Sequence, residues 1–201
     1  MIDERSFASW LKGILTEPSP GRTPRLDKAT RLAFVDKLFS EFEKHMATQP
    51  PAKVADALER LIDAGQSDTM FLLFDANVPL DARVHAIGSL AGVVRYLQRH
   101  CASSPDLTNL CEEWWDRFPA HPDPADAARH EIDMAILSFF SQTLKSDSSL
   151  IQKFALHGLG HWQHAYSKEV GLAIADFIAA RPDIDADIRK YAEAAREGLV
   201  L

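Results

Sequence analysis

Apolar side chains recur every three to four positions along most of the chain, which is the spacing of one face of an α-helix. Such stripes run through residues 7–15, 32–42, 54–62, 84–97, 132–144 and 170–178. No Asn-Gly or Asp-Gly pair lies between alternating apolar residues, so the signals of β-hairpins are missing from the sequence. The pattern predicts an all-α protein with nine or ten helices in antiparallel succession.

Proline and glycine mark the expected boundaries of these helices. Residues 18–24 hold three prolines and a glycine, and we expect a linker there. A single helix is predicted over residues 26–46, and the next one begins at Pro51. The apolar segment 69–74 is predicted to be a short buried helix, and Gly198 is expected to end the last helix.

One local pattern of small residues occurs in three of the predicted helices. An apolar or small residue is followed four and seven positions later by small residues, and in two copies a leucine comes next. The copies begin at Ala82, Ile151 and Ile188, which are 69 and 37 residues apart and so lie close to two units and one unit of a single period. Small residues at these positions allow a second helix to approach closely. A period of this length is typical of stacked helical pairs.

The pattern resembles the repeats of HEAT-type and armadillo-type α-solenoids. The matching residues are Pro79, Asp81, Arg83, Ala86 and Leu90 in one copy, and Asp187, Ile188, Arg189, Ala192 and Ala195 in another. The middle copy has Gln152 in place of the basic residue, and the last has Arg196 in place of the leucine. The resemblance covers residues 79–98 and 125–198, and no matching segment precedes residue 50.

This resemblance implies a right-handed α-α superhelix of stacked antiparallel pairs. We expect one domain over residues 1–201, with capping helices in residues 1–48 and HEAT-like pairs in residues 50–201. An irregular helical bundle is the alternative fold. Solenoids of this kind commonly bind proteins on an extended concave surface.

Composition narrows the choice of partner and compartment. The formal net charge is -7, which disfavours binding to nucleic acid and favours a basic protein partner. The first residues lack the layout of a signal peptide, and no run of about 18 uncharged apolar residues occurs. We therefore expect a cytoplasmic protein that does not enter a membrane, with Cys101 and Cys111 as buried free thiols rather than a disulfide.

Three histidines form the sharpest cluster of chemically active side chains. His157, His161 and His164 follow one another at spacings of four and three, so a helix would place them on one stripe. At about 100° per residue they fall largely opposite the apolar face that carries Phe154 and Leu159. Two imidazoles one turn apart can chelate zinc, and a third could complete an open site. The other interpretation is a solvated or partner-facing stripe, because the glutamate of a His-Glu-x-x-His motif is absent.

Two glycines and two tryptophans add expectations about accessibility. Gly158 is predicted to allow a close backbone approach, and Gly160, on the histidine stripe, to leave room for a ligand or a partner side chain.

Trp114 and Trp115 are adjacent, so a helix cannot direct both toward one core. One ring, which we take to be Trp115, is either an exposed recognition anchor or is covered by the proline-rich loop 119–124.

No nucleophile motif, phosphate-binding loop or dinucleotide fingerprint occurs, and we expect no cofactor. The sequence therefore favours a non-catalytic interaction scaffold or adaptor with a basic protein partner, such as an effector neutralised in the manner of an immunity protein. The expected contact residues are His157, His161, His164, Trp115, Arg83, His85 and Lys153. The alternatives are a metal-dependent hydrolase or metal-binding protein that uses the three histidines, and a structural subunit that associates with itself.

Overall fold

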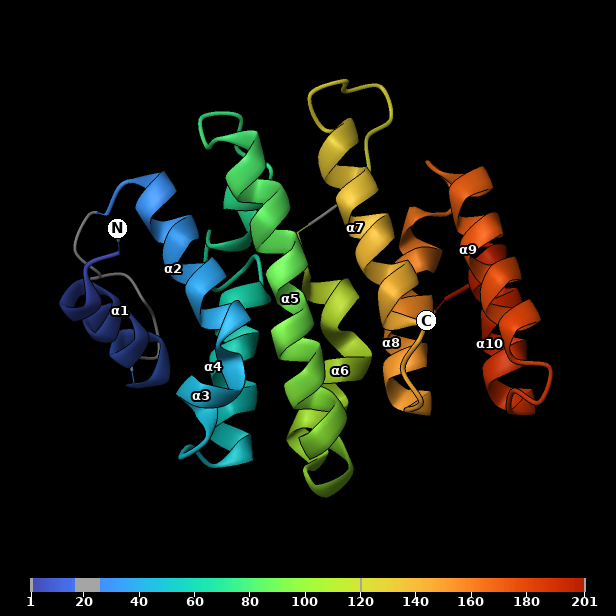
Figure 1. Ribbon diagram of the computed structural model, residues 1–201, viewed down its shortest axis with the longest axis horizontal. Helices are drawn as coiled ribbons and strands as arrows, with labels where there is room; N and C mark the ends of the chain where they lie inside the picture. Colours follow the sequence, from blue (N-terminus) through green and yellow to red (C-terminus); the bar gives the residue numbers. More distant parts are fainter. Residues whose placement is uncertain (1, 17–25, 120, 201) are drawn as a thin grey trace. The chain divides into compact units, whose positions relative to one another are not determined.

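The computed structural model of this protein describes residues 2–16, 26–119 and 121–200. Every regular element within these ranges is helical, with ten α-helices and two short 3-10 helices (Figure 1). The all-α prediction and the predicted number of helices are therefore confirmed. Among the described helices, none combines the length and the apolar character needed to cross a bilayer. The predicted linker at residues 18–24 lies outside the described residues.

Most of the described helices follow one another through connections of a few residues, whereas the longer segment 118–129 separates α6 from α7. In chain order they are α1 (Glu4–Thr16), α2 (Lys28–Ser40), α3 (Phe42–Met46), α4 (Pro51–Ile62), η1 (Met70–Leu73), α5 (Leu80–His100), η2 (Cys101–Ser103), α6 (Pro105–Arg117), α7 (His130–Thr143), α8 (Ser149–Trp162), α9 (Ser167–Ala180) and α10 (Ala186–Arg196).

Local chemistry accounts for several of the helix ends. The Asp27 carboxylate accepts a hydrogen bond from the Thr30 backbone N–H at 2.9 Å and so caps α2. Pro51 is the first residue of α4, as predicted, because the N–H that proline lacks has no partner in a first helical turn. Gly198 follows α10 with a φ of 73°, a left-handed conformation that glycine adopts without steric cost. The predicted ends at Pro51 and Gly198 are thus confirmed.

The single helix predicted over residues 26–46 is wrong, because Glu41 separates α2 from α3. Glu41 has φ -106° and ψ 25°, outside the helical geometry of its neighbours. The break directs Phe42 onto the Tyr96 ring of α5, with a centroid separation of 5.2 Å and an edge-on geometry. Packing against α5 therefore overrides a continuous local helical pattern.

Contacts along the chain group the residues into two compact units, Met1–Ala120 and His121–Leu201, which we call unit 1 and unit 2. The single-domain assignment and the capping role of residues 1–48 stay predictions, as does the right-handed superhelix.

Unit 1 is built around the packing of α2 against α5. The two helices lie side by side and run in the same direction, while α4 packs against α6 and α1 (Figure 1). Gly92 makes the approach possible, because a Cβ atom there would lie 1.9 Å from the Phe39 carbonyl oxygen. Cys101 and Cys111 are both buried and both free, which confirms the prediction of two buried thiols.

Unit 2 is built around α8, which packs against α7, α9 and α10. A Cβ atom at Gly158 would lie 2.2 Å from the Phe140 ring of α7, so the predicted close approach at this glycine is confirmed. The prediction for Gly160 is wrong. A Cβ atom there would lie 2.5 Å from the Val200 side chain, so the space beside Gly160 is filled by the chain itself.

Candidate functional site

His85 lies on the surface of unit 1 and is held by a carboxylate from a neighbouring helix. Its Nδ1 atom lies 2.8 Å from the Asp36 Oδ1 atom of α2, although 49 residues separate the two positions. The His85 side chain is 73% exposed and that of Asp36 is 28% exposed. One hydrogen bond therefore restrains the imidazole, while most of the His85 side chain remains open to solvent.

A hollow of about 440 Å³ lies beside this pair, between the N-terminal halves of α2 and α5. It is lined by Ala29, Leu32, Ala33, Asp36, Asp81, Ala82 and His85. Three alanines make the lining shallow and apolar, and two aspartates give it negative charge. Asp81 is exposed in the first turn of α5. The hollow can accept an apolar stem that ends in a positive charge.

The other predicted contact residues on α5 and α8 differ in accessibility. Lys153 is exposed on α8, as a partner-facing residue must be. Arg83 is only 6% exposed, and its buried Nε atom has no hydrogen-bond partner among the described residues. A guanidinium in that position is a weak candidate for first contact with a partner.

Trp115 is not an exposed anchor, because its side chain is only 4% exposed. Its ring lies 5.2 Å from the Phe118 ring in an edge-on geometry, and Phe118 in turn contacts Phe74 at 6.4 Å. Trp114 is 1% exposed. Burial rules out the exposed anchor, and the Phe118 ring contributes to the cover of Trp115, whereas cover by the loop 119–124 stays a prediction.

The three predicted histidines do not share one environment. His157 is 4% exposed, His161 is half-buried, and His164 is exposed beyond the end of α8. The expectation that all three fall opposite the core is therefore wrong for His157. The reason is that α8 is packed on nearly all sides, so its outer stripe is buried as well.

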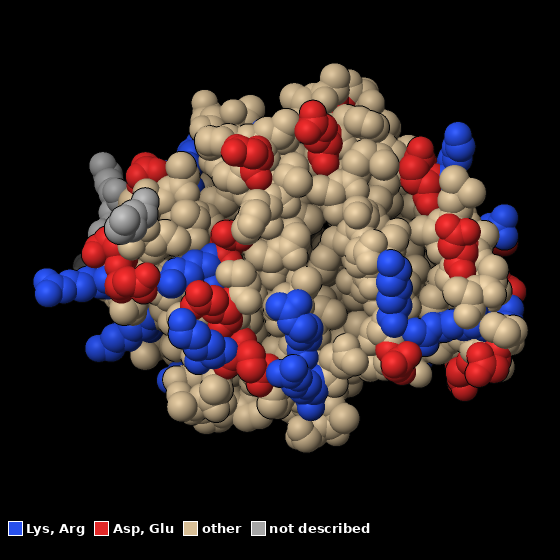
Figure 2. Space-filling view, viewed as in Figure 1, with Lys and Arg blue, Asp and Glu red and all other residues tan. Residues whose placement is uncertain are grey.

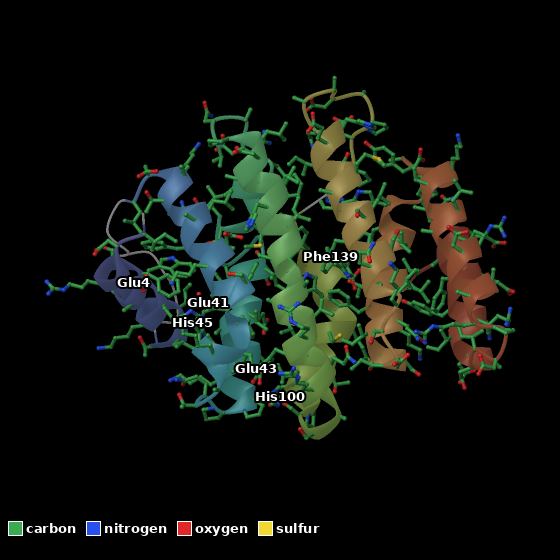
Figure 3. All side chains as sticks on the ribbon, viewed as in Figure 1. Glu4, Glu41, Glu43, His45, His100 and Phe139 are labelled. Atoms are coloured by element: carbon green, nitrogen blue, oxygen red, sulfur yellow. The ribbon has the colours of Figure 1, made fainter. Side chains whose placement is uncertain are left out.

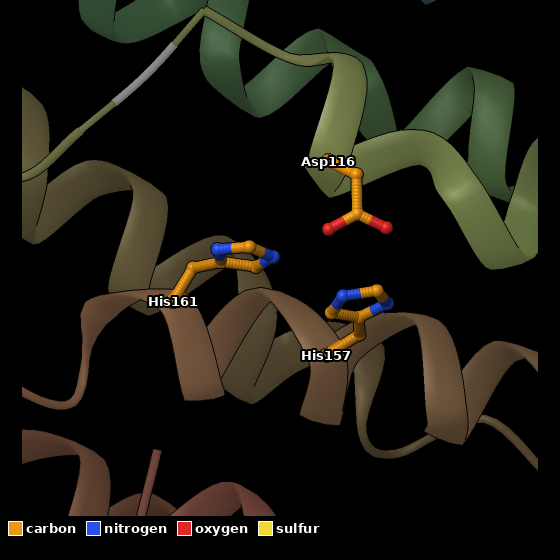
Figure 4. Close-up of side chains that lie close together, drawn as sticks. All are labelled: Asp116, His157 and His161. Carbon is orange, nitrogen blue, oxygen red and sulfur yellow. The ribbon is translucent and has the colours of Figure 1, made fainter. Parts of the chain in front are cut away.

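His157 and His161 nevertheless form a close pair on successive turns of α8 (Figure 4). Their rings stack with centroids 4.9 Å apart and an interplanar angle of 16°. A ring nitrogen of one lies within 4.8 Å of a ring nitrogen of the other. Asp116, also labelled in Figure 4, belongs to α6 of unit 1. The geometry reduces the predicted triplet to a pair of imidazoles that can act together.

No known protein family, curated protein or solved structure matches this chain. The resemblance to HEAT-type and armadillo-type repeats stays an interpretation of the sequence pattern.

A network of charged groups lies where α2, α3 and α5 meet (Figure 3). Glu41 accepts a hydrogen bond from Lys44 at 2.8 Å and lies 3.3 Å from His45. Burial lowers the pKa of His45, and this outweighs the opposing effect of Glu41. Because these charges neutralise one another at a partly exposed surface, they add little stability and do not point to a ligand.

The same region carries the positive charges of α5. Glu43 lies 3.3 Å from both Arg99 and His100. Arg95 and Arg99 are exposed, and basic side chains gather over the C-terminal half of α5 in Figure 2. The two ends of α5 therefore differ in charge, with the acidic hollow at the N-terminal end.

Unit 2 contains a buried polar cluster that sequence reasoning missed. Asp133 is fully buried and accepts hydrogen bonds from the Tyr166 hydroxyl at 2.9 Å and from the Asp123 backbone N–H at 3.2 Å. Arg129 lies 3.8 Å from Asp133 and donates to the His121 carbonyl at 2.6 Å. The cluster ties residues 121–129 to α7 and so has a structural role.

Two pKa shifts follow from this burial. Burial raises the pKa of Asp133, and its hydrogen bonds only partly oppose that effect. Burial, together with the bond to Asp133, raises the pKa of Tyr166 to about 12. No local sequence motif indicates the buried cluster around Asp133. The only sequence signal is an acidic residue in the apolar stripe of a predicted helix.

Proposed function

We propose that this protein is a non-catalytic protein-binding module and that the hollow between α2 and α5 receives a basic segment of its partner. The observation that carries the proposal is the lining of this hollow, in which alanines form the apolar part and Asp36 and Asp81 supply negative charge. A lysine or arginine side chain can place its aliphatic stem on such a surface and its charged group against the carboxylates.

The negative charge of the protein favours a basic partner both during its approach and in direct contact. The net charge of -7 favours the approach of a basic protein from afar. At short range, an ion pair with a partly exposed carboxylate contributes about 0.2–1 kcal/mol, so two such pairs together correspond to at most roughly thirtyfold in affinity. A phosphate backbone would meet repulsion at the same carboxylates, so nucleic acid is not the proposed ligand.

Exposure of the Asp36–His85 pair favours binding over catalysis. An enzyme gains from acid–base pairs that are enclosed and shielded from water. Here the histidine side chain is 73% exposed. The pair is better suited to fix the position of the Asp36 carboxylate at the edge of the hollow. A role as an adaptor, or as an inhibitor of a basic effector, is the biological form of this proposal.

Binding of fluorescein-labelled peptides, measured by fluorescence anisotropy at low and high salt, tests the proposal. We expect a short peptide of alternating arginine and alanine to bind, with an affinity that falls as salt rises. Its glutamate counterpart should not bind. The double variant Asp36→Asn, Asp81→Asn should bind several-fold more weakly, by up to about thirtyfold.

Two matched controls locate the effect. Asp56→Asn removes one charge from an exposed position of α4 in the same unit and should leave binding within a factor of about two. Ala33→Leu fills the hollow and should weaken binding, whereas Ala52→Leu on the exposed face of α4 should not. Equal losses in the hollow variants and in their controls would contradict the proposed location. Equal binding of the basic and acidic peptides would contradict the proposed partner chemistry.

A further inference from the structure

A second site is indicated by the paired imidazoles of α8. We propose that His157 and His161 bind one divalent transition-metal ion of the zinc, copper or nickel class. This site lies within unit 2 and does not depend on the proposed peptide-binding hollow of unit 1.

The spacing of the pair fits chelation. Histidines four residues apart on a helix lie one turn above one another, and here their rings are stacked at 4.9 Å. In a tetrahedral site with Zn–N bonds of about 2.0–2.1 Å, two ligand nitrogens lie about 3.3 Å apart. The nitrogens of His157 and His161 already lie within 4.8 Å of each other. Rotation about the side-chain torsions of both histidines, with the helix unchanged, has to shorten this distance and turn the two rings out of their stack so that both nitrogens point at one ion.

The backbone that carries the pair is held firmly. Between the two histidines, Gly158 lies against the Phe140 ring and Gly160 lies against Val200. These contacts are so close that each would exclude a Cβ atom, so they fix the rotation of α8 about its own axis. A preformed helix loses little conformational freedom when the two imidazoles close on an ion.

Local electrostatics also favour a cation at this place. His161 lies in the last turn of α8, where the helix dipole places partial negative charge. His157 is 4% exposed, so the attraction between an ion and this end of the helix is less screened than at an open surface.

The ligand set selects the class of ion. Neutral imidazole suits zinc, copper and nickel, whereas magnesium and calcium prefer oxygen ligands. The order of affinity should follow the general series, with Cu²⁺ bound more tightly than Ni²⁺ or Zn²⁺. His164 is exposed beyond the helix end and is not part of the proposed pair.

Titration of the full chain, first treated with a chelator, tests this site directly. Isothermal titration with ZnCl₂ or NiCl₂ should give one ion per chain, and MgCl₂ should give no binding. His161→Gln should weaken binding at least about tenfold, because one of two ligands is lost. His164→Gln is the matched control and should bind like the unaltered chain.

Spectroscopy keeps the test decisive if the buried variant His157→Gln does not fold. Electron paramagnetic resonance of the Cu²⁺-loaded chain should show coupling to two imidazole nitrogens, and that of His161→Gln should show one. Circular dichroism in the presence of chelator establishes that each variant is folded. Absence of stoichiometric binding, or equal losses in His161→Gln and His164→Gln, would overturn the proposal and leave the peptide-binding hollow unaffected.

Discussion

The contact between α2 and α5 makes a sharp prediction for two glycines that lie one turn apart on α5. Gly88 has open space where a Cβ atom would be, whereas a Cβ atom at Gly92 would lie 1.9 Å from the Phe39 carbonyl oxygen. We expect Gly88→Ala to stabilise the protein and Gly92→Ala to destabilise it. The same chemical change on one helix thus has opposite effects.

The magnitudes follow from the geometry. An ordinary contact begins at 3.4 Å, so Gly92→Ala requires Phe39 and Gly92 to separate by about 1.5 Å. The carbonyl belongs to the backbone of α2, so it cannot rotate away as the end of a flexible side chain could. Overpacking of this kind costs about 1–3 kcal/mol or more, and the gain in helix propensity offsets at most about 1 kcal/mol. Gly88→Ala receives only the gain, about 0.4–1 kcal/mol.

Urea unfolding of the two variants and the unaltered chain measures this difference. Far-UV circular dichroism and tryptophan fluorescence should be followed together, because two compact units can unfold in separate steps. We expect the midpoint to fall for Gly92→Ala and to rise slightly for Gly88→Ala at an unchanged slope. Because both variants share the gain in helix propensity, their unfolding free energies should differ by the overpacking cost of about 1–3 kcal/mol or more, which corresponds to melting temperatures several degrees apart.

The reasoning is refuted if Gly92→Ala is as stable as Gly88→Ala at an unchanged slope. That result would mean that α2 and α5 can separate without cost, and that their close approach does not hold unit 1 together.

The remaining predictions concern single side chains. Tyr166→Phe should lower the unfolding free energy by about 1–3 kcal/mol in urea titrations, because the buried Asp133 carboxylate loses a donor; a change below about 0.5 kcal/mol would contradict this. Because the folded state raises the pKa of Asp133, it retains a proton that the unfolded chain has lost, so the contribution of this group to stability should fall as pH rises from about 3.8 through the raised pKa. Asp133→Asn should remove that slope from stability curves measured across the acid range. Arg83→Met should leave stability unchanged or raise it, since a buried guanidinium is replaced by an apolar group, and a large loss would show that the charge is compensated in the folded protein. Ser104→Ala should cost about 1 kcal/mol in thermal unfolding, because it removes the side-chain cap of α6, and an unchanged melting temperature would show that the bond to Leu107 adds nothing.

Helix positions could be predicted because they depend on local periodicity. Pro51 and Gly198 act on the backbone of their own residues, so their effects are visible in the sequence alone. The break at Glu41 has no such local cause. It depends on α5, which approaches through Gly92 and offers Tyr96 to Phe42, and these contacts join residues that are far apart in the chain.

Burial of the histidines shows a second limit of pattern reasoning. The helical stripe correctly placed His157 and His161 on one side of α8. It wrongly assumed that the side opposite Phe154 and Leu159 faces solvent, which holds only for a helix packed on one face. The apolar Leu156 and the small Gly160 are the residues of α8 that indicate packing on the remaining sides of this helix.

The hollow of unit 1 could not be derived from either helix alone. The sequence predicts His85 as a contact residue, but its partner Asp36 lies 49 positions earlier and belongs to no motif. Ala33 and Ala82 look like ordinary helix-forming residues until α2 and α5 are placed side by side. These residues line one hollow only because the two helices pack side by side.

Alkylation of two buried thiols provides a measure of local opening in unit 1. Cys101 and Cys111 lie 3% and 0% exposed, near the corner where α5 turns through η2 into α6. A thiol reagent reaches them when that corner opens, so the rate of alkylation relative to that of the unfolded chain reports the free energy of opening. A ligand that holds this corner closed would slow the alkylation of the two thiols, and a ligand that binds elsewhere would leave the alkylation rate unchanged.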